Sequence, residues 1–225
     1  MIIAIDGPAG SGKSSTAREV ARRTDALYID TGAMYRAVAL LSLQRGVEPE
    51  SDKFDRLIPQ INIKLEQSES GVHVFLNGED VSERIRSSEV SDMSSRVSKR
   101  LDVRNRMVEL QRQMADEAMR AGMSVVMEGR DIGTVVFPEA QFKFFLVADP
   151  RVRAKRRALQ MKEKGLEADQ EKLYNELIER DERDATRTHS PLTRAEDAIE
   201  IDTSVVSFEE QVENIIAVIS GNEVD

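Results

Sequence analysis

The sequence predicts an α/β fold in which a parallel sheet carries a small antiparallel insert. Short apolar runs lie at residues 1–5, 26–30, 123–128, 142–148 and 198–202, and helical patterns separate or follow them. Short buried strands that alternate with helices indicate a parallel sheet covered on both faces, with right-handed crossovers. Residues of about 60–95 break this rhythm, because "INIKLEQ" alternates strictly between apolar and polar side chains and "VHVFLNG" alternates again.

The N-terminal strand is "MIIAI", a short β-branched run that glycines follow directly. A helical pattern begins at Ser14 and leads to a second short strand, "ALYID". The next segment, "TGAMYRAVALLSLQRG", predicts a helix with Thr31 as a candidate N-cap and Gly46 as its stop. The later strands "MSVVME", "FKFFLVA" and "AIEID" complete the series.

The insert at about 60–95 is predicted to be a hairpin with a further strand. "SESG" predicts the turn between its two alternating runs, and Asn77-Gly78 is a strong signal for a second hairpin turn. "EDVSERI" is the candidate third strand. At the C-terminal end, the tail "GNEVD" is expected to be frayed.

The composition limits the class of protein. A chain of 225 residues, 40% of them hydrophobic, can bury one sizeable core or a core with a small insert. No apolar run approaches ~20 residues, and the first residues lack the pattern of a signal peptide, so we expect a soluble cytoplasmic protein. The chain has no cysteine and two histidines, which argues against disulfides, thiolate chemistry and His-rich metal sites. A net charge of -9 and a pI near 5.0 argue against a nucleic-acid partner.

The segment "GPAGSGKS" matches the phosphate-loop pattern GxxxxGK[ST] between a predicted strand and a predicted helix. Glycines let the backbone N–H groups surround a phosphate, and the helix N-terminus adds partial positive charge. Lys13 can bridge the β- and γ-phosphates of a nucleotide, and the Ser14 hydroxyl can bind Mg²⁺. An ordinary glycine-rich turn is the alternative, which the strand–loop–helix context disfavours. The residues assigned to ATP are Gly7, Pro8, Ala9, Gly10, Ser11, Gly12, Lys13, Ser14 and Ser15.

Two further segments place polar residues where predicted strands end. In "YIDTGAMYRAV", Tyr35 and Arg36 are candidates to face a second substrate, because ligands of open α/β sheets lie at the carboxyl ends of strands. The alternative is that Asp30 or Thr31 caps the helix and Tyr35 belongs to the core. In "VVMEGRDIGTVVFP", Glu128 is a candidate to hold Mg²⁺ through water. The Arg–Asp pair that follows Gly129 could also be an ordinary surface ion pair, but the glycines that bracket the charges favour a site.

Arginines recur at helical spacing in two segments near the C-terminal end. "IERDERDATR" places Arg180, Arg183 and Arg187 on one helix face, with Asp184 among them. "RVRAKRRALQ" repeats the spacing with Arg153, Arg156 and Arg157. A solvated helix face would show similar spacing. Two arginine-rich faces are nevertheless costly without an anion, and a triphosphate supplies one.

Taken together, these segments resemble the bacterial cytidylate kinases. The blocks that carry the resemblance are "DGPAGSGKSS", "DTGAMYRA", "NGEDVSERIR", "EGRDIGTVVFP" and "ERDERDATR", in family order from residue 6 to 187, and "IEIDTS" near 200 continues it. The resemblance implies a monomeric P-loop NTPase core with a five-stranded parallel sheet flanked by helices. That core would comprise 1–59 and 96–225 of a single kinase chain, with a CMP-binding insert at 60–95 and a helical lid within 151–187, connected around Gly165.

The family's residues can be carried over by motif. The residues implied to bind CMP are Thr31, Tyr35, Arg36, Ser95, Arg104, Arg130, Asp131, Arg180, Asp184 and Arg187. Those implied to act in catalysis are Lys13, Arg130, Arg180 and Arg187, with Arg157 on the ATP and with Ser14 and Glu128 on the metal. Glu128 stands where other members have Asp. Asp131, Arg104 and Ser95 can match the donor and acceptors of cytosine, which leaves Arg36, Arg130 and Arg187 for the phosphate.

The activity implied is direct in-line transfer of the ATP γ-phosphoryl group to CMP or dCMP, with Mg²⁺ and without a covalent intermediate. The attacking phosphate oxygen is already ionised near neutral pH, so a strong general base is unnecessary. Two alternatives stay open: a P-loop kinase for another small acceptor, such as UMP or shikimate, and a nucleotide-dependent switch. The switch leaves the arginines and the second group of polar residues without a role.

Overall fold

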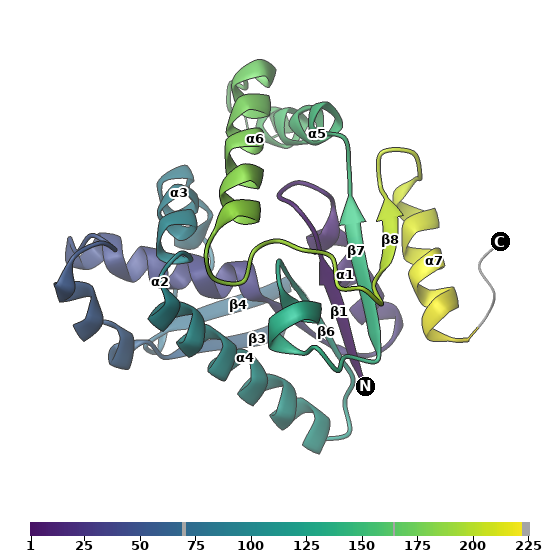
Figure 1. The fold of residues 1–225 in the computed structure, drawn as a ribbon, viewed down its shortest axis with the longest axis horizontal. Coiled ribbons are helices and arrows are strands. Elements are labelled where there is room, and N and C mark those ends of the chain that lie inside the picture. Colours follow the sequence, from purple (N-terminus) through teal and green to yellow (C-terminus); the bar gives the residue numbers. More distant parts are fainter. Residues whose placement is uncertain (69–70, 164, 222–225) are drawn as a thin grey trace.

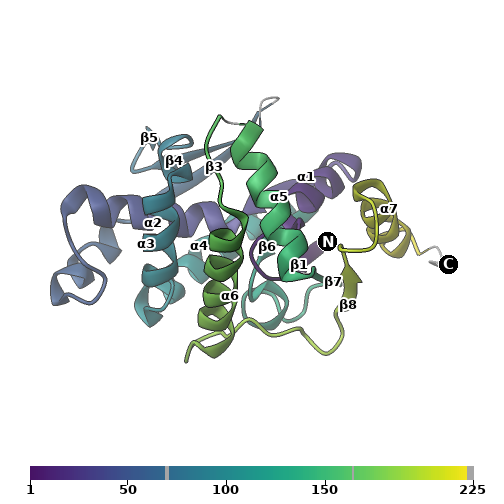
Figure 2. The same ribbon diagram turned by 90° about the horizontal axis from the view of Figure 1, so that it is seen from above.

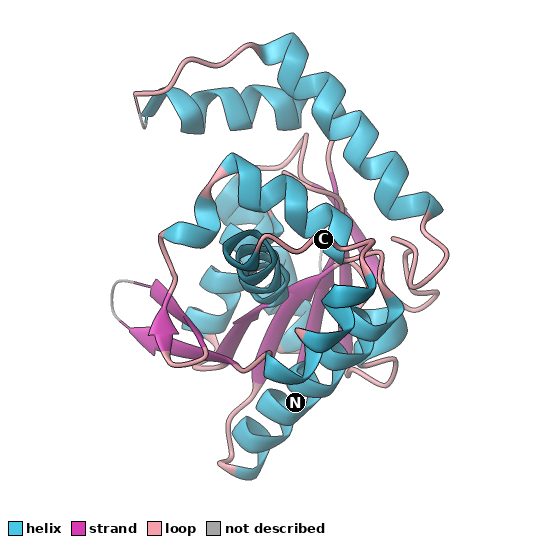
Figure 3. Ribbon diagram, turned by 90° about the vertical axis from the view of Figure 1, so that its left-hand side faces the viewer, coloured by secondary structure: helices cyan, strands magenta, loops and turns pink. Residues whose placement is uncertain are grey.

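The computed structural model describes residues 1–68, 71–163 and 165–221. Its main sheet has five parallel strands in the order β2-β6-β1-β7-β8. Figure 1 shows β7 beside β8, and Figure 3 shows the strands in magenta among the helices. They are β1 (Ile2–Asp6), β2 (Leu27–Asp30), β6 (Val125–Gly129), β7 (Phe142–Val147) and β8 (Ile199–Asp202). The predicted five-stranded parallel sheet is confirmed, with ends that differ from the predicted ones by a few residues at most.

Helices cover both faces of the sheet, as the strand pattern predicts. Ile2 and Ala4 of β1 pack with α2 (Thr31–Arg45) and α4 (Leu101–Arg120), whereas Ile3 and Ile5 pack with α1 (Lys13–Arg23) and α7 (Phe208–Ile219). Successive side chains of a strand point to opposite faces, so a strand covered on both sides must be apolar throughout. Within the described residues, no helix is long and apolar enough to span a membrane.

The insert is a three-stranded antiparallel sheet of β3 (Ile63–Ser68), β4 (Gly71–Leu76) and β5 (Glu79–Asp80). Asn77 and Gly78 both have positive φ, 52° and 87°, and form the tight turn that the sequence predicts. The candidate third strand exists but is two residues long. Residues 69–70 of the predicted "SESG" turn, and 222–225 of the tail, lie outside the described residues. Short 3₁₀ turns (Asp52–Arg56, Ile58–Gln60, Arg84–Arg86) and α3 (Ser88–Val97) connect the insert to the core.

The segment expected to be a lid is a pair of helices, α5 (Pro150–Glu163) and α6 (Gln170–Thr186). They lie beyond the carboxyl ends of the strands in Figure 1, and Figure 2 shows the pair from above. Gly165 in their connection has a φ of 72°, which favours glycine. The two helices share a small apolar cluster that also includes Ala9 of the phosphate loop. The pair therefore contacts the main core at the nucleotide loop.

Candidate active site

The phosphate loop follows the central strand β1 and opens α1. Gly7, Gly10 and Gly12 all have positive φ, at 150°, 75° and 90°. A Cβ on Gly7 would lie 2.2 Å from the carbonyl oxygen of Leu146 on β7, so only glycine fits there. Gly12 is the N-cap of α1 and has no side chain to accept from the first N–H groups of the helix. Those N–H groups can therefore donate to an anion.

Lys13 is buried at the mouth of this loop, and its Nζ donates to the carbonyl oxygen of Pro8 at 3.0 Å. Burial lowers the pKa of Lys13 to about 7, and the positive charge of Arg130 contributes to this shift, whereas Glu128 opposes it. A phosphate chain in the loop would favour the charged form again. The hydrogen bond to Pro8 O therefore positions the Lys13 ammonium group where it can bind an anion.

Glu128 lies at the carboxyl end of β6, directly beside α1. Its Oε2 accepts from the Ser14 hydroxyl at 2.8 Å, and its Oε1 accepts from the Tyr28 hydroxyl at 2.5 Å. Burial raises the pKa of Glu128, and the nearby Asp30 raises it further. A hydroxyl and a carboxylate are oxygen donors of the kind that Mg²⁺ prefers, so the pair fits a magnesium ion. The described residues contain no cluster of three or more acidic or histidine side chains that could hold a metal by themselves.

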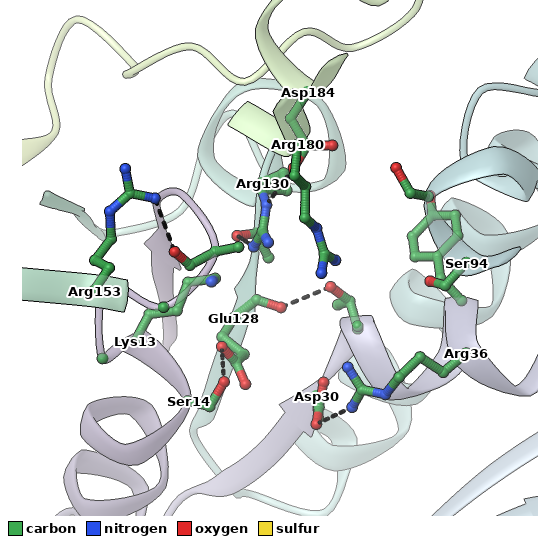
Figure 4. A pocket seen from close by; sticks show the side chains of 18 of the residues that line it. Lys13, Ser14, Asp30, Arg36, Ser94, Glu128, Arg130, Arg153, Arg180 and Asp184 are labelled. Carbon is green, nitrogen blue, oxygen red and sulfur yellow. Dashed lines mark hydrogen bonds and ion pairs between the residues drawn. The ribbon is translucent and has the colours of Figure 1, made fainter. Parts of the chain in front are cut away.

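A cavity of about 510 Å³ extends from the phosphate loop to α3 and α4. All ten residues that the sequence assigns to the second substrate line it, as do Glu128 and Arg157. Of the loop residues, Ala9, Gly10, Gly12, Lys13, Ser14 and Ser15 line it, whereas Gly7, Pro8 and Ser11 do not. Figure 4 shows Arg130 from the end of β6 and Arg180 from α6 near Lys13 and Glu128. Segments far apart in the sequence are thus brought to one cavity.

The far end of the cavity contains a buried ion pair between Arg104 of α4 and Asp131. Arg187 lies beside it, with Nη2 3.9 Å from Asp131 Oδ1. Among the described residues, Ser95 Oγ, Arg104 Nε and Arg187 Nη2 are buried without a hydrogen-bond partner. Buried polar atoms in native proteins are nearly always paired, so these unpaired atoms, which belong to residues that line the same cavity as Asp131, indicate the position of a polar ligand.

The middle of the cavity is lined by arginines that acidic side chains hold in place. Arg36 donates to Asp30 at 3.1 Å, and Arg130 Nε donates to Asp184 at 3.0 Å. Burial lowers the pKa of Arg180 to about 10, with Arg130 as the second cause. Cations this close repel one another, so the arrangement favours a ligand with several negative charges.

Comparison with known proteins agrees with this geometry. The family model described as "Cytidylate kinase" matches residues 3–221. The chain belongs to the cytidylate kinase family. A cytidylate kinase of Pelotomaculum thermopropionicum is 48% identical over 97% of this chain and 95% of its own, and one of Syntrophotalea carbinolica is 45% identical over 98% and 92%. A crystal structure of an uncharacterized protein from Eubacterium ventriosum has a TM-score of 0.54 at 16% identity, covers 99% of each chain and shows the fold alone.

Two details of the local structure differ from the sequence-based expectation for this family member. Thr31 is not the N-cap of α2: the Asp30 side chain caps it, with Oδ1 accepting from Ala33 N at 2.7 Å. Thr31 is instead the first helical residue, and its hydroxyl donates to the carbonyl oxygen of Glu128 at 2.7 Å. Arg183 does not line the cavity with Arg180 and Arg187, and its guanidinium lies 3.7 Å from Asp92 on α3.

Arg153, Arg156 and Arg157, the arginines of α5 that the sequence analysis names, have different surroundings. Arg153 is buried and donates to Ala148 O and Ala9 O at 3.0 and 2.9 Å, and it pairs with Asp181 of α6 at 2.6 Å. Arg156 donates to Thr203. Arg157 lines the cavity without a polar partner among the described residues, which makes it the best placed of the three to meet ATP.

Sequence reasoning missed several residues at or beside this site, and two of them make contacts that shape it. Gln211 of α7 lines the cavity beside the phosphate loop and donates to Thr16 of α1. Asp6, at the end of β1, accepts from backbone N–H groups 126 and 127 residues away. Asp6 lies inside the recognised "DGPAGSGKSS" block, but its spacing carried no signal for these contacts, because they form only when the strands assemble.

Proposed function

We propose that this chain transfers the γ-phosphoryl group of ATP to CMP or dCMP, giving ADP and CDP or dCDP. The observation that carries the proposal is one cavity with a phosphate loop at one end and a pocket of unpaired buried donors around Asp131 at the other. The nucleotides would lie end to end, and the reacting phosphates would meet between them. Membership of the cytidylate kinase family supports the same substrates.

Cytosine fits the far pocket chemically. Its N4 amino group is a donor, and its N3 and O2 atoms are acceptors, so it needs a carboxylate and two donors. Asp131 supplies the carboxylate, and Arg104 and Ser95 supply the donors that lack partners. Uracil would place a carbonyl oxygen against Asp131, and such a buried mismatch costs about 1–3 kcal/mol or more.

The arginines between the two ends serve the phosphates. We assign Arg36, Arg130 and Arg187 to the CMP phosphate, and Lys13 and Arg180 to the phosphoryl group that moves. Mg²⁺, when bound, supplies charge neutralisation on the triphosphate, and Ser14 and Glu128 are the residues that would hold it. Positioning and charge neutralisation account for catalysis, since the attacking phosphate oxygen is already ionised. Closure of α5 and α6 over the site would exclude water.

The proposal includes a monomer that acts on small molecules in the cytoplasm. A net charge of -9 disfavours a polyanion such as nucleic acid as a partner, while the local cluster of arginines favours small anions. The donor is taken to be ATP, as the family implies.

A panel of acceptors tests the proposal: CMP, dCMP, UMP, AMP and shikimate, each with ATP and Mg²⁺ in a coupled assay for ADP. We expect rapid turnover with CMP and dCMP and at least tenfold lower kcat/KM with UMP, in line with one buried mismatch. Preference for UMP or shikimate would replace the proposed acceptor. Slow ATP hydrolysis that no acceptor stimulates would favour the nucleotide-dependent switch.

A variant of the base pocket sharpens this test. Asp131→Ala should reduce CMP preference over UMP much more than it changes the KM for ATP, because Asp131 lies at the far end of the cavity. Asp92→Ala is the matched control, since Asp92 is an exposed acid that pairs with Arg183 of α6 and is not among the residues that line the cavity. An unchanged ratio of CMP to UMP activity in Asp131→Ala would remove Asp131 from base recognition.

A further inference from the structure

A buried carboxylate lies between the phosphate loop and the acceptor pocket. Asp6 ends the central strand β1 and is only 5% exposed. Its Oδ1 accepts from Ile132 N at 2.9 Å, and its Oδ2 accepts from Gly133 N at 2.8 Å. Both oxygens are therefore used by the backbone that directly follows Arg130 and Asp131.

That backbone forms a turn of five residues, Ile132–Val136, with π-type geometry. Two N–H groups late in the turn donate to the carbonyl oxygen of Asp131, at 2.9 and 3.2 Å. The two N–H groups at its start have their partner in Asp6. Arg112 of α4 donates to the last two carbonyl oxygens of the turn, both at 2.9 Å. The turn is thus held at each end by a charged side chain from another element.

A carboxylate suits this position better than a neutral side chain. Each of the two N–H groups donates to its own oxygen of Asp6, and an amide side chain would offer an oxygen to only one of those positions. Burying a carboxylate nevertheless disfavours its charged form. A charge retained in the core at this cost suggests a role other than general stability.

We propose that Asp6 is a positioning residue for the acceptor pocket: its carboxylate fixes the backbone that sets the place of Arg130 and Asp131. One strand end then aligns both nucleotides, because Asp6 is followed directly by Gly7 of the phosphate loop. The inference rests on the proposed function, which assigns Arg130 and Asp131 to CMP. A reacting group displaced by about 1 Å can lower the rate about a hundredfold, so a small shift of this turn matters.

Asp6→Asn is the variant that tests this role, because it keeps the size of the side chain and places an N–H donor against one of the two backbone N–H groups. We expect kcat/KM for CMP to fall about tenfold to a hundredfold, because one or two charge-assisted hydrogen bonds are lost. The CMP to UMP ratio should fall with it, and the KM for ATP should stay within about threefold. Gln141→Met is the control: Gln141 accepts from Ile2 N at 2.6 Å at the other end of β1, far from the cavity.

A second variant reaches the same contact from the turn. A Cβ on Gly133 would lie 3.5 Å from Asp6 Oδ2, an ordinary contact, and 3.2 Å from Cδ of the flexible Lys143 side chain. The larger side chain of Gly133→Val extends past that Cβ, so this variant should displace Asp6 from the turn and give the same selective loss for CMP, and Gly133→Ala is its control. Gly133→Val decides the question if Asp6→Asn does not fold. Unchanged CMP kinetics in folded Asp6→Asn and Gly133→Val, or equal losses for CMP and ATP, would overturn the proposal.

An NMR measurement separates this inference from the proposed function. The amide protons of Ile132 and Gly133 should shift upfield in Asp6→Asn, whatever the acceptor is, because a hydrogen bond to a carboxylate is lost. Unshifted amides would overturn the positioning role even in an active kinase. Wild-type protein that does not phosphorylate CMP, with shifted amides in the variant, would instead refute the assigned substrate.

Discussion

Replacement of Gly7 by alanine tests the packing of the phosphate loop against the sheet. The new Cβ would lie 2.2 Å from the carbonyl oxygen of Leu146, an atom of the neighbouring strand that β1 pairs with in register. Relief of such an overlap in a packed core costs about 1–3 kcal/mol. The φ of 150° at Gly7 adds backbone strain of about 1–3 kcal/mol for any residue with a side chain. Gly7→Ala should therefore lower the free energy of unfolding by roughly 2–6 kcal/mol.

Gly46→Ala separates the two causes. Gly46 also has a positive φ, 59°, but a Cβ added there would meet nothing within 4 Å, so only strain of about 1–2 kcal/mol applies. Urea unfolding of both variants, followed by circular dichroism, gives the two free energies of unfolding directly. If Gly7→Ala loses no more stability than Gly46→Ala, the contact with Leu146 is not a constraint and the reasoning fails.

Three further predictions follow from charged residues. Lys13→Ala should lower kcat by on the order of 10²–10³, which steady-state kinetics measures. The free energy of unfolding should stay unchanged or rise in this variant, because burial disfavours the charge of Lys13; urea unfolding measures it. Arg153→Leu should lower the free energy of unfolding by about 3 kcal/mol, since it leaves Asp181 unpaired. Arg151→Leu breaks an exposed pair between the same helices and should lower it by under ~1 kcal/mol; thermal unfolding compares the two variants. Burial raises the pKa of Asp6 to about 6, so the folded state binds this proton more tightly than the unfolded state. The free energy of unfolding should then fall as pH rises from about 4 to about 6, by roughly 3 kcal/mol more in wild type than in Asp6→Asn. If the free energy of unfolding changes with pH equally in the two proteins, the prediction is wrong.

The fold could be predicted from the sequence because its strands are short apolar runs beside clear turn signals. Asn77-Gly78 fixed the hairpin, and Gly46 ends α2 as predicted. The sequence offered Asp30 and Thr31 as caps of α2, and the structure uses Asp30; both are good N-cap residues, and periodicity cannot choose between neighbours. Arg183 was misplaced for a similar reason: residues three or four apart share a helix face only approximately, and a partner on α3 decides where the side chain turns.

Those residues of the candidate site that belong to a sequence motif could be predicted. Those that come together only when the chain folds could not. The positions of Lys13 and Ser14 follow from the spacing of one loop, and resemblance supplied the acceptor residues. The anchoring role of Arg153 could not be read from spacing, because its partners come from the phosphate loop and from α6. Side chains that hold one element against another are specified by the whole fold, so the pattern around them carries little signal.

The electrostatics of the cavity explain why its acidic residues matter as much as its arginines. Burial and mutual repulsion lower the pKa values of Lys13 and Arg180, so an arginine cluster alone would oppose folding. Asp30, Asp131 and Asp184 each contact one or more of the cavity arginines, and these pairs hold the guanidinium groups in position before any ligand arrives. A triphosphate that enters meets donors that are already oriented, so little free energy is spent on ordering them. In the proposed arrangement, two nucleotides placed end to end would bring more negative charge to these arginines than the three carboxylates supply, so the charge of the cavity favours that pair of ligands.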